Sequence, residues 1–269
     1  MVAPFQVVSD VTDCPSPDIL SVSANKDMMF AAAFGNHIFR KNHEDKWSQA
    51  DEGLPEGTVV NRLRVIDGSV YACTNKGLFY HDANMWYATE ITIPCFQVVK
   101  NGAFFAAATE YGIWYKIGMR WENIAYRNIA VYDLLLTPQY YLLGTQQGIS
   151  LYDLYTDSGF DFPLGDAVTS LAVVQGRLLG ASLQGKLVQG NQKGGFTLCG
   201  FEGITLYSLK ATKTGVYVCS SQGLYRIQML GSRVILQAML SGYPVTDMCC
   251  AGDYMYISTL NSGLKKVAL

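Results

Sequence analysis

The chain has 269 residues and a net charge of −2, with 49% hydrophobic and only 16% charged residues. It shows no basic stripe of the kind that binds nucleic acid and no run of the roughly 18 apolar residues that would cross a membrane, so we expect neither partner. The seven cysteines are odd in number, lie mostly in apolar strand patterns and include no C-x-x-C pair. Together with a start that lacks a signal-like segment, they predict a cytoplasmic protein without a metal or cofactor.

One pattern recurs from the beginning of the chain to its end. It consists of an apolar strand, a short turn, a second apolar strand ending in Thr or Ser, two polar residues, Gly and a third strand. Six marker glycines follow one another at intervals of 35, 36, 37, 38 and 40 residues: Gly77, Gly112, Gly148, Gly185, Gly223 and Gly263. A degenerate copy covers residues 30–39. Each copy has room for four short strands, so seven copies predict an all-β, seven-bladed β-propeller forming one domain over residues 1–269.

Large aromatic residues open the expected fourth strands, where we expect them to pack between adjacent blades: Trp47, Trp86, Trp121, Phe160 and Phe196. The chain ends soon after the third strand of the seventh copy. We therefore expect the N-terminal segment at residues 5–8 to supply the missing outer strand, which would remove an open sheet edge.

The stretch at residues 47–55, WSQADEGLP, and the stretch at residues 65–79, VIDGSVYACTNKGLF, carry a family resemblance. Together they resemble sialidase-like repeat propellers, which include photosystem-assembly-factor-like and sensor-propeller proteins. The Asp-box turn of sialidases, Ser-x-Asp-x-Gly-x-x-Trp, is absent, and no arginine triad can be assigned. The resemblance therefore implies a propeller and does not imply sugar hydrolysis.

A polar residue interrupts the expected first strand of each copy: Ser21, Arg62, Gln97, Asp133, Ser170, Ser208 and Asp247. Arg64 and Lys210 follow two residues later on the same side of their strands. Because the first strands of a propeller line its central channel, these side chains predict one asymmetric polar binding site at the top of the channel. The alternative interpretation is a hydrated channel mouth that binds no ligand.

Three residues are candidates for catalysis. Asp133 and Asp247 come from blades three apart and could form a carboxylate pair with one member protonated. His37, in the turn between the second and third strands of the first copy, is the one histidine placed for general-base chemistry near the mouth. Glu110 and Tyr111, in the equivalent turn of the third copy, are binding candidates.

These patterns leave three functions open. The first is a binding or scaffold protein that holds a small polar molecule or a protein partner at the top face. The second is a lyase, isomerase or hydrolase that uses Asp and His acid–base chemistry at the channel mouth. The third is a carbohydrate-binding propeller, which would need an exposed Trp in each repeat.

Overall fold

The computed structural model describes residues 7–11, 14, 16–24, 28–35, 37–42, 46–191 and 194–269. These residues form seven four-stranded antiparallel sheets and no helix, which confirms the predicted all-β, seven-bladed propeller. We call the strands of each blade A to D along the meander. No helix of the described residues is long and apolar enough to cross a membrane. The chain forms two compact units, residues 1–98 with 242–269, and residues 99–241, which are described separately below.

The first unit holds blades 1, 2 and 7. Blade 1 consists of β2 (Ile19–Ala24), β3 (Met29–Ala33), β4 (His37–Lys41) and β5 (Trp47–Gln49). Blade 2 consists of β6 (Val60–Ile66), β7 (Ser69–Thr74), β8 (Gly77–Asp82) and β9 (Met85–Ala88). Blade 7 consists of β26 (Val245–Ala251), β27 (Tyr254–Thr259), β28 (Leu264–Ala268) and β1 (Val7–Asp10). The A strand β2 lies beside both β6 and β26.

The boundary between the two units falls within β10 (Cys95–Asn101), the A strand of blade 3. Blade 3 continues with β11 (Phe104–Thr109), β12 (Gly112–Ile117) and β13 (Arg120–Ala125). Blade 4 consists of β14 (Val131–Leu136), β15 (Tyr140–Thr145), β16 (Gly148–Asp153) and β17 (Ser158–Pro163). Blade 5 consists of β18 (Val168–Val174), β19 (Arg177–Ser182), β20 (Leu187–Gly190) and β21 (Phe196–Cys199). Blade 6 consists of β22 (Leu206–Thr212), β23 (Gly215–Ser220), β24 (Gly223–Leu230) and β25 (Arg233–Ser241).

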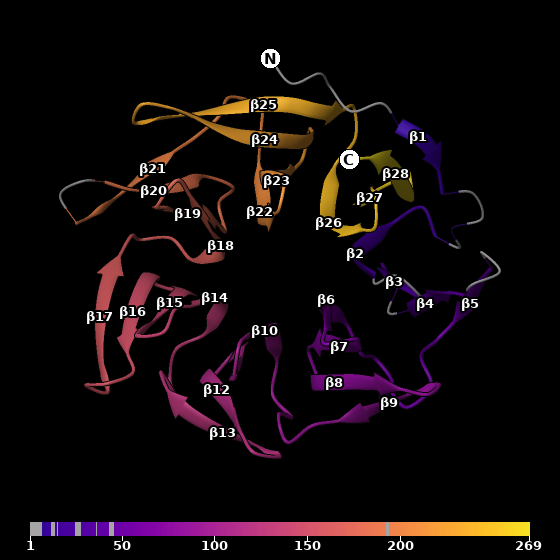
Figure 1. The fold of residues 1–269 in the computed structure, drawn as a ribbon, viewed down its shortest axis with the longest axis horizontal. Coiled ribbons are helices and arrows are strands. Elements are labelled where there is room, and N and C mark those ends of the chain that lie inside the picture. The colour runs from indigo at the N-terminus through magenta and orange to yellow at the C-terminus, as the bar shows by residue number, and fades with distance from the viewer. Residues whose placement is uncertain are drawn as a thin grey trace. The chain divides into compact units, whose positions relative to one another are not determined.

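The N-terminal strand completes blade 7, as the sequence predicts. β1 pairs with β28 in antiparallel register, with Val7 opposite Val267 and Asp10 opposite Lys265 (Figure 1). The strand begins at Val7, and the first two residues of the predicted segment, Phe5 and Gln6, lie outside the described residues.

The recurring Thr/Ser-x-x-Gly pattern closes the B–C turns. In blade 2, the Thr74 hydroxyl donates a hydrogen bond to the Gly77 carbonyl (2.8 Å) and accepts one from the Lys76 N–H (3.0 Å). Gly77 has φ +128°, and a Cβ at this position would lie 2.1 Å from the Ile91 carbonyl oxygen. The turn therefore requires glycine both for its backbone angle and for its close approach to the next segment.

The aromatic residues of the D strands do not all behave as predicted. Trp86 is buried against Phe30 of blade 1, and its indole N–H donates to the Ala50 carbonyl (2.7 Å), so it joins two blades. Trp121 is also buried. Phe160 is 58% exposed, so the prediction of inter-blade packing is wrong at this position, which lies on the open edge strand of blade 4.

Candidate functional site

His37 and Asp51 form a hydrogen-bonded pair at the first residue of β4. The His37 Nδ1 lies 2.8 Å from the Asp51 carboxylate, whose two oxygens also accept hydrogen bonds from the Ile38 N–H (2.6 Å) and the Gln49 amide (2.6 Å). The two groups are close enough to form an ion pair when the imidazole is protonated. A His whose Nδ1–H donates to a carboxylate presents its Nε2 as an acceptor, and the His37 side chain is 52% exposed.

Strand pairing brings the two residues together across blade 1. β4 and β5 run antiparallel with Phe39 opposite Gln49, and the Ala50 N–H donates to the Ile38 carbonyl (2.8 Å). The pairing thus continues past the end of β5 and places Asp51 next to the start of β4.

Trp86 holds the connection that follows Asp51. Its backbone N–H donates to the Glu52 carbonyl (2.8 Å), and its indole N–H donates to the Ala50 carbonyl. Gly53 has φ +93°, and a Cβ there would lie 2.2 Å from the Trp86 carbonyl oxygen. The connection from blade 1 to blade 2 therefore packs against Trp86, a buried residue of blade 2, and is hydrogen-bonded to it.

A pocket of 430 Å³ lies between this connection and His37. His37, Asp51 and Glu56 provide its polar groups, and Leu54 and Pro55 are among its apolar ones. The pocket lies at the B–C turn edge of the unit, because in an antiparallel meander the B–C turns and the D-to-A connections share one edge. Its exposed imidazole and two carboxylates can accept hydrogen bonds and exchange a proton.

Exposed apolar side chains adjoin this pocket in the chain. Phe34, one residue before the pocket residue Gly35, is 72% exposed, and Val59, one residue after Thr58, is also exposed. The backbone of Val59 is fixed by two hydrogen bonds with Asn75 in the B–C turn of blade 2. This edge thus carries exposed apolar residues that are next in the chain to residues of a polar pocket.

The polar A-strand residues of the first unit are engaged with the backbone or with one another. Asp247 is buried, and its carboxylate accepts hydrogen bonds from the Met248 N–H (2.8 Å) and the Ser21 hydroxyl (2.5 Å). Arg64 donates to the Gln97 side-chain carbonyl (2.8 Å), which also accepts from the Val98 N–H (3.1 Å). Arg62 is half-buried.

The second unit repeats this arrangement. The Asp133 carboxylate is buried and accepts hydrogen bonds from the N–H groups of Leu134 (2.9 Å) and Leu171 (2.8 Å), the latter in the next blade. The Ser170 hydroxyl accepts from the Leu209 N–H (3.0 Å), again in the next blade. These contacts join neighbouring A strands.

The remaining predicted binding residues lie in the second unit. Ser208 is buried, and its hydroxyl has no hydrogen-bond partner among the described residues. Lys210 is buried, whereas Tyr111 is exposed in the β11–β12 turn, next to Glu110. No group of three or more His, Cys, Asp or Glu residues that could hold a metal ion occurs in the described part of the chain.

The sequence pattern identified His37 but not its partners Asp51 and Gln49, nor Glu56, which lines the same pocket. The nearest sequence signal was the register of the hairpin that joins β4 to β5, which would have placed Asp51 opposite His37. The polar partners of His37 are therefore not the A-strand residues with which it was grouped.

No protein-family model and no curated protein sequence matches the chain. Among solved structures, the BT4673 extracellular domain from B. thetaiotaomicron matches with a TM-score of 0.74 at 14% identity, covering 98% of this chain and 40% of that one. A catalytically inactive virginiamycin B lyase from Staphylococcus aureus matches with a TM-score of 0.73 at 11% identity, covering 97% and 98%. PorZ, a surface component of the type-IX secretion system of Porphyromonas gingivalis, matches with a TM-score of 0.69 at 16% identity. The match covers 94% of this chain and 37% of PorZ.

These likenesses show the fold alone, because every identity is below 25%. They confirm the predicted resemblance to repeat propellers at that level. The chain spans about two fifths of the BT4673 domain and of PorZ, and the neighbours differ in function.

Proposed function

We propose that the chain is a binding protein that holds a protein partner at the B–C turn edge of blades 1 and 2. The observation that carries the proposal is the exposure of Phe34 beside the His37–Asp51 pocket. The corresponding turn positions of blades 2 and 4 hold the polar residues Asn75 and Gln146, whereas that of blade 5 holds an exposed but smaller apolar residue, Leu183. A Phe exposed in such a turn gains free energy when a partner covers it.

The chemistry of the partner follows from the edge. Phe34 and Val59 offer apolar surface, while the Asp51 and Glu56 carboxylates and the His37 imidazole offer hydrogen-bond acceptors. A protein segment that presents an apolar side chain beside a basic one complements both features.

The test compares Phe34→Asp with Met119→Asp, using the full chain as bait in quantitative affinity purification. Met119 is a matched control because it is 85% exposed in the β12–β13 turn, in the other unit. We expect a partner recovered with the wild type to be retained by Met119→Asp and lost by Phe34→Asp. The purified partner should then bind Phe34→Asp at least tenfold more weakly than the wild type. Equal binding of both variants would reject this edge as the binding surface.

The His37–Asp51 pair favours a second candidate, an enzyme in which His37 acts as a general base through Nε2. Incubation with a pool of small polar metabolites, followed by mass spectrometry, tests this function. Turnover by the wild type and by Phe34→Asp, but not by His37→Gln, would support it. Turnover that His37→Gln retains would exclude this base. Asp133 and Asp247 remain predicted catalytic residues, to be tested in the same assay as Asp→Asn variants.

The carbohydrate-binding alternative has less support. Trp86 and Trp121 are buried and Trp47 and Trp114 are partly buried, so the described part of the chain offers no exposed tryptophan platform. A glycan array in which the wild type gives no hit would end this interpretation.

A further inference from the structure

We propose that a second site, between blades 4 and 5, binds an amphipathic organic anion, with its apolar body between the two sheets and its carboxylate on Arg177. The site is a pocket of 880 Å³ in the second unit, within the size range of pockets that hold small-molecule ligands. None of its lining residues belongs to the His37 pocket.

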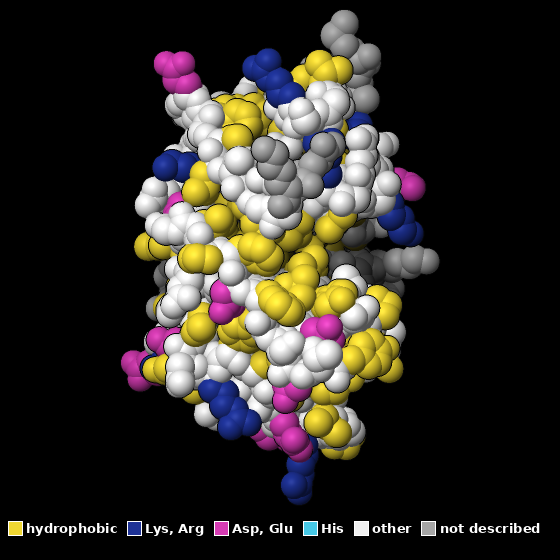
Figure 2. Space-filling view, turned by 90° about the vertical axis from the view of Figure 1, so that its left-hand side faces the viewer, with side chains coloured by type: hydrophobic (Ala, Val, Ile, Leu, Met, Phe, Trp, Pro, Cys, Tyr) yellow, Lys and Arg dark blue, Asp and Glu magenta, His cyan; other side chains and the backbone are white. Residues whose placement is uncertain are grey.

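Two sheets supply the apolar part of the pocket. Leu142 and Leu151 are cross-strand neighbours on blade 4, and Ile149 and Phe162 form a second such pair. Leu178 and Phe196 of blade 5 also line the pocket. The rings of Phe196 and Phe162 pack edge to face, with their centroids 5.3 Å apart. Figure 2 faces the outer strands of these blades and shows hydrophobic side chains gathered across the middle of this face.

A missing side chain explains why the space between the blades is not filled. Gly190 pairs with Phe196 in blade 5, and a Cβ built on Gly190 would lie 3.4 Å from the Leu178 carbonyl oxygen and 3.6 Å from the Phe196 ring. Both are ordinary contact distances, and no positive φ requires glycine here. A Cβ at this position is therefore compatible with the strand, and we infer that glycine leaves the space open.

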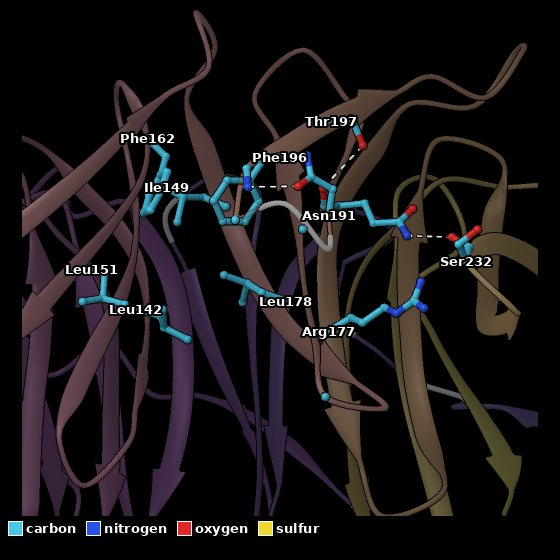
Figure 3. Close-up of a pocket in the computed structure, with 15 residues that line it drawn as sticks. Leu142, Ile149, Leu151, Phe162, Arg177, Leu178, Asn191, Phe196, Thr197 and Ser232 are labelled. Atoms are coloured by element: carbon cyan, nitrogen blue, oxygen red, sulfur yellow. Dashed lines mark hydrogen bonds between the residues drawn. The ribbon is translucent and has the colours of Figure 1, made fainter.

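The opposite end of the pocket is polar. Figure 3 shows Arg177 and Ser232 at one end and Leu142, Leu151 and Phe162 at the other. The Gln189 amide donates to the Ser232 carbonyl (2.8 Å), so the tip of the long β24–β25 hairpin of blade 6 borders this end.

Arg177 gives the site its charge preference. Among the described residues, no carboxylate pairs with its guanidinium and no hydrogen bond engages it. A guanidinium at the end of an apolar pocket binds a carboxylate through two parallel hydrogen bonds, and this interaction is stronger than a neutral hydrogen bond. The pocket therefore selects a ligand with an apolar body and one anionic end.

Isothermal titration calorimetry with decanoate, and with the uncharged 1-decanol as its matched ligand, tests the proposal. We expect the wild type to bind decanoate more tightly than 1-decanol. Arg177→Gln should weaken decanoate binding at least tenfold and leave 1-decanol binding unchanged. Arg120→Gln, which removes an exposed arginine from the β12–β13 hairpin of blade 3, should bind decanoate like the wild type.

A second variant tests the position of the apolar body. Gly190→Leu should abolish binding of both ligands while its near-ultraviolet circular dichroism stays that of the wild type. Failure of the wild type to bind decanoate, equal decanoate affinity of Arg177→Gln and the wild type, or unchanged binding by folded Gly190→Leu would each overturn the proposal. None of these results bears on the partner edge at Phe34, which lies in the other unit.

Discussion

At the scale of single residues, polar side chains of the A strands accept hydrogen bonds from backbone N–H groups. Each A strand is an edge strand of its own sheet, and these N–H groups have no partner within that sheet. An A strand pairs with its B strand on one side only, so half of its N–H groups point away from its own sheet. Asp133 accepts one such N–H from its own strand and one from the next blade, and Ser21 and Ser170 each accept one from the next blade. A buried N–H without a partner costs free energy, so these residues stabilise the joints between blades.

The first prediction concerns Asp133. Asp133→Asn leaves one carbonyl oxygen for two buried N–H groups, and we expect it to lower the free energy of unfolding by about 2 kcal/mol. Urea denaturation measures the loss. Asp253→Asn, in the exposed β26–β27 turn, is the control and should stay within about 0.5 kcal/mol of the wild type. Equal stability of the two variants would contradict the structural role.

The second prediction concerns alkaline pH. Burial and the Asp161 carboxylate raise the pKa of Tyr126 to about 12, and burial and the hydrogen bond to Asp157 raise the pKa of Tyr152 to about 12. An unfolded Tyr titrates near pH 10, so between about pH 10 and 12 the unfolded chain holds fewer protons on these residues than the folded one. Stability is therefore fully present below about pH 10 and is lost as the pH rises toward 12.

Urea denaturation at pH 9 and pH 11 checks this pH dependence. The double variant Tyr126→Phe, Tyr152→Phe should lose less stability between the two pH values than the wild type. Tyr155→Phe, at an exposed position, should behave like the wild type. A double variant with the full wild-type loss would show that other groups cause the alkaline instability.

At the scale of elements, the connection between β5 and β6 shows how one blade shapes the site of another. The backbone N–H and the indole N–H of Trp86 donate hydrogen bonds to carbonyl groups within residues 50–53. These bonds hold the segment where Asp51 contacts His37. The residues of this segment specify a turn, but the residue that holds the turn in place, Trp86, belongs to β9, more than thirty residues further along the chain.

The third prediction tests the contact between this segment and Trp86. Gly53→Ala places a Cβ against the Trp86 backbone at a positive φ, and we expect a loss of about 3 kcal/mol in the free energy of unfolding. Gly57→Ala has the same kind of φ but open space around its Cβ, so it should cost about 1 kcal/mol. Thermal unfolding of both variants measures the difference. Equal losses would mean that backbone angle, and not contact with Trp86, requires glycine at position 53.

At the scale of the whole molecule, the chain's two ends meet in one sheet, since β1 supplies the D strand of blade 7. An uncovered β28 would present a row of free N–H and C=O groups to other chains. The joining of the termini therefore stabilises the blade and also protects against edge-to-edge association.

The fourth prediction follows from this joint. Deleting residues 1–10 should lower the Tm by about 5 °C or more and promote self-association, because β28 loses its partner strand. Differential scanning calorimetry and size-exclusion chromatography measure the two effects. Deleting residues 1–6 leaves β1 in place and should lower the Tm less than the longer deletion does. A monomer of unchanged Tm after the longer deletion would show that β1 contributes nothing to blade 7.

The sequence by itself determined the number of blades, the order of their strands and the origin of the last strand. These features depend on residues that are close in the chain: Thr74 and Gly77 close one turn through their own hydrogen bonds, and the pattern repeats at a nearly constant interval. That is why a local pattern was enough to predict them.

Only the tertiary structure decided what the polar and small residues do. One of the two N–H groups that Asp133 accepts lies 38 residues away, in the next blade. The partner of His37 lies just past the end of the neighbouring strand, and residues of blade 4 line the pocket beside Gly190. Apart from the hairpin register that relates Asp51 to His37, the spacing of these residues in the chain carries no signal of their contact, because connections of unequal length separate the blades. Several polar residues of the predicted site also link neighbouring strands, and a pocket that no sequence motif marks lies beside a glycine.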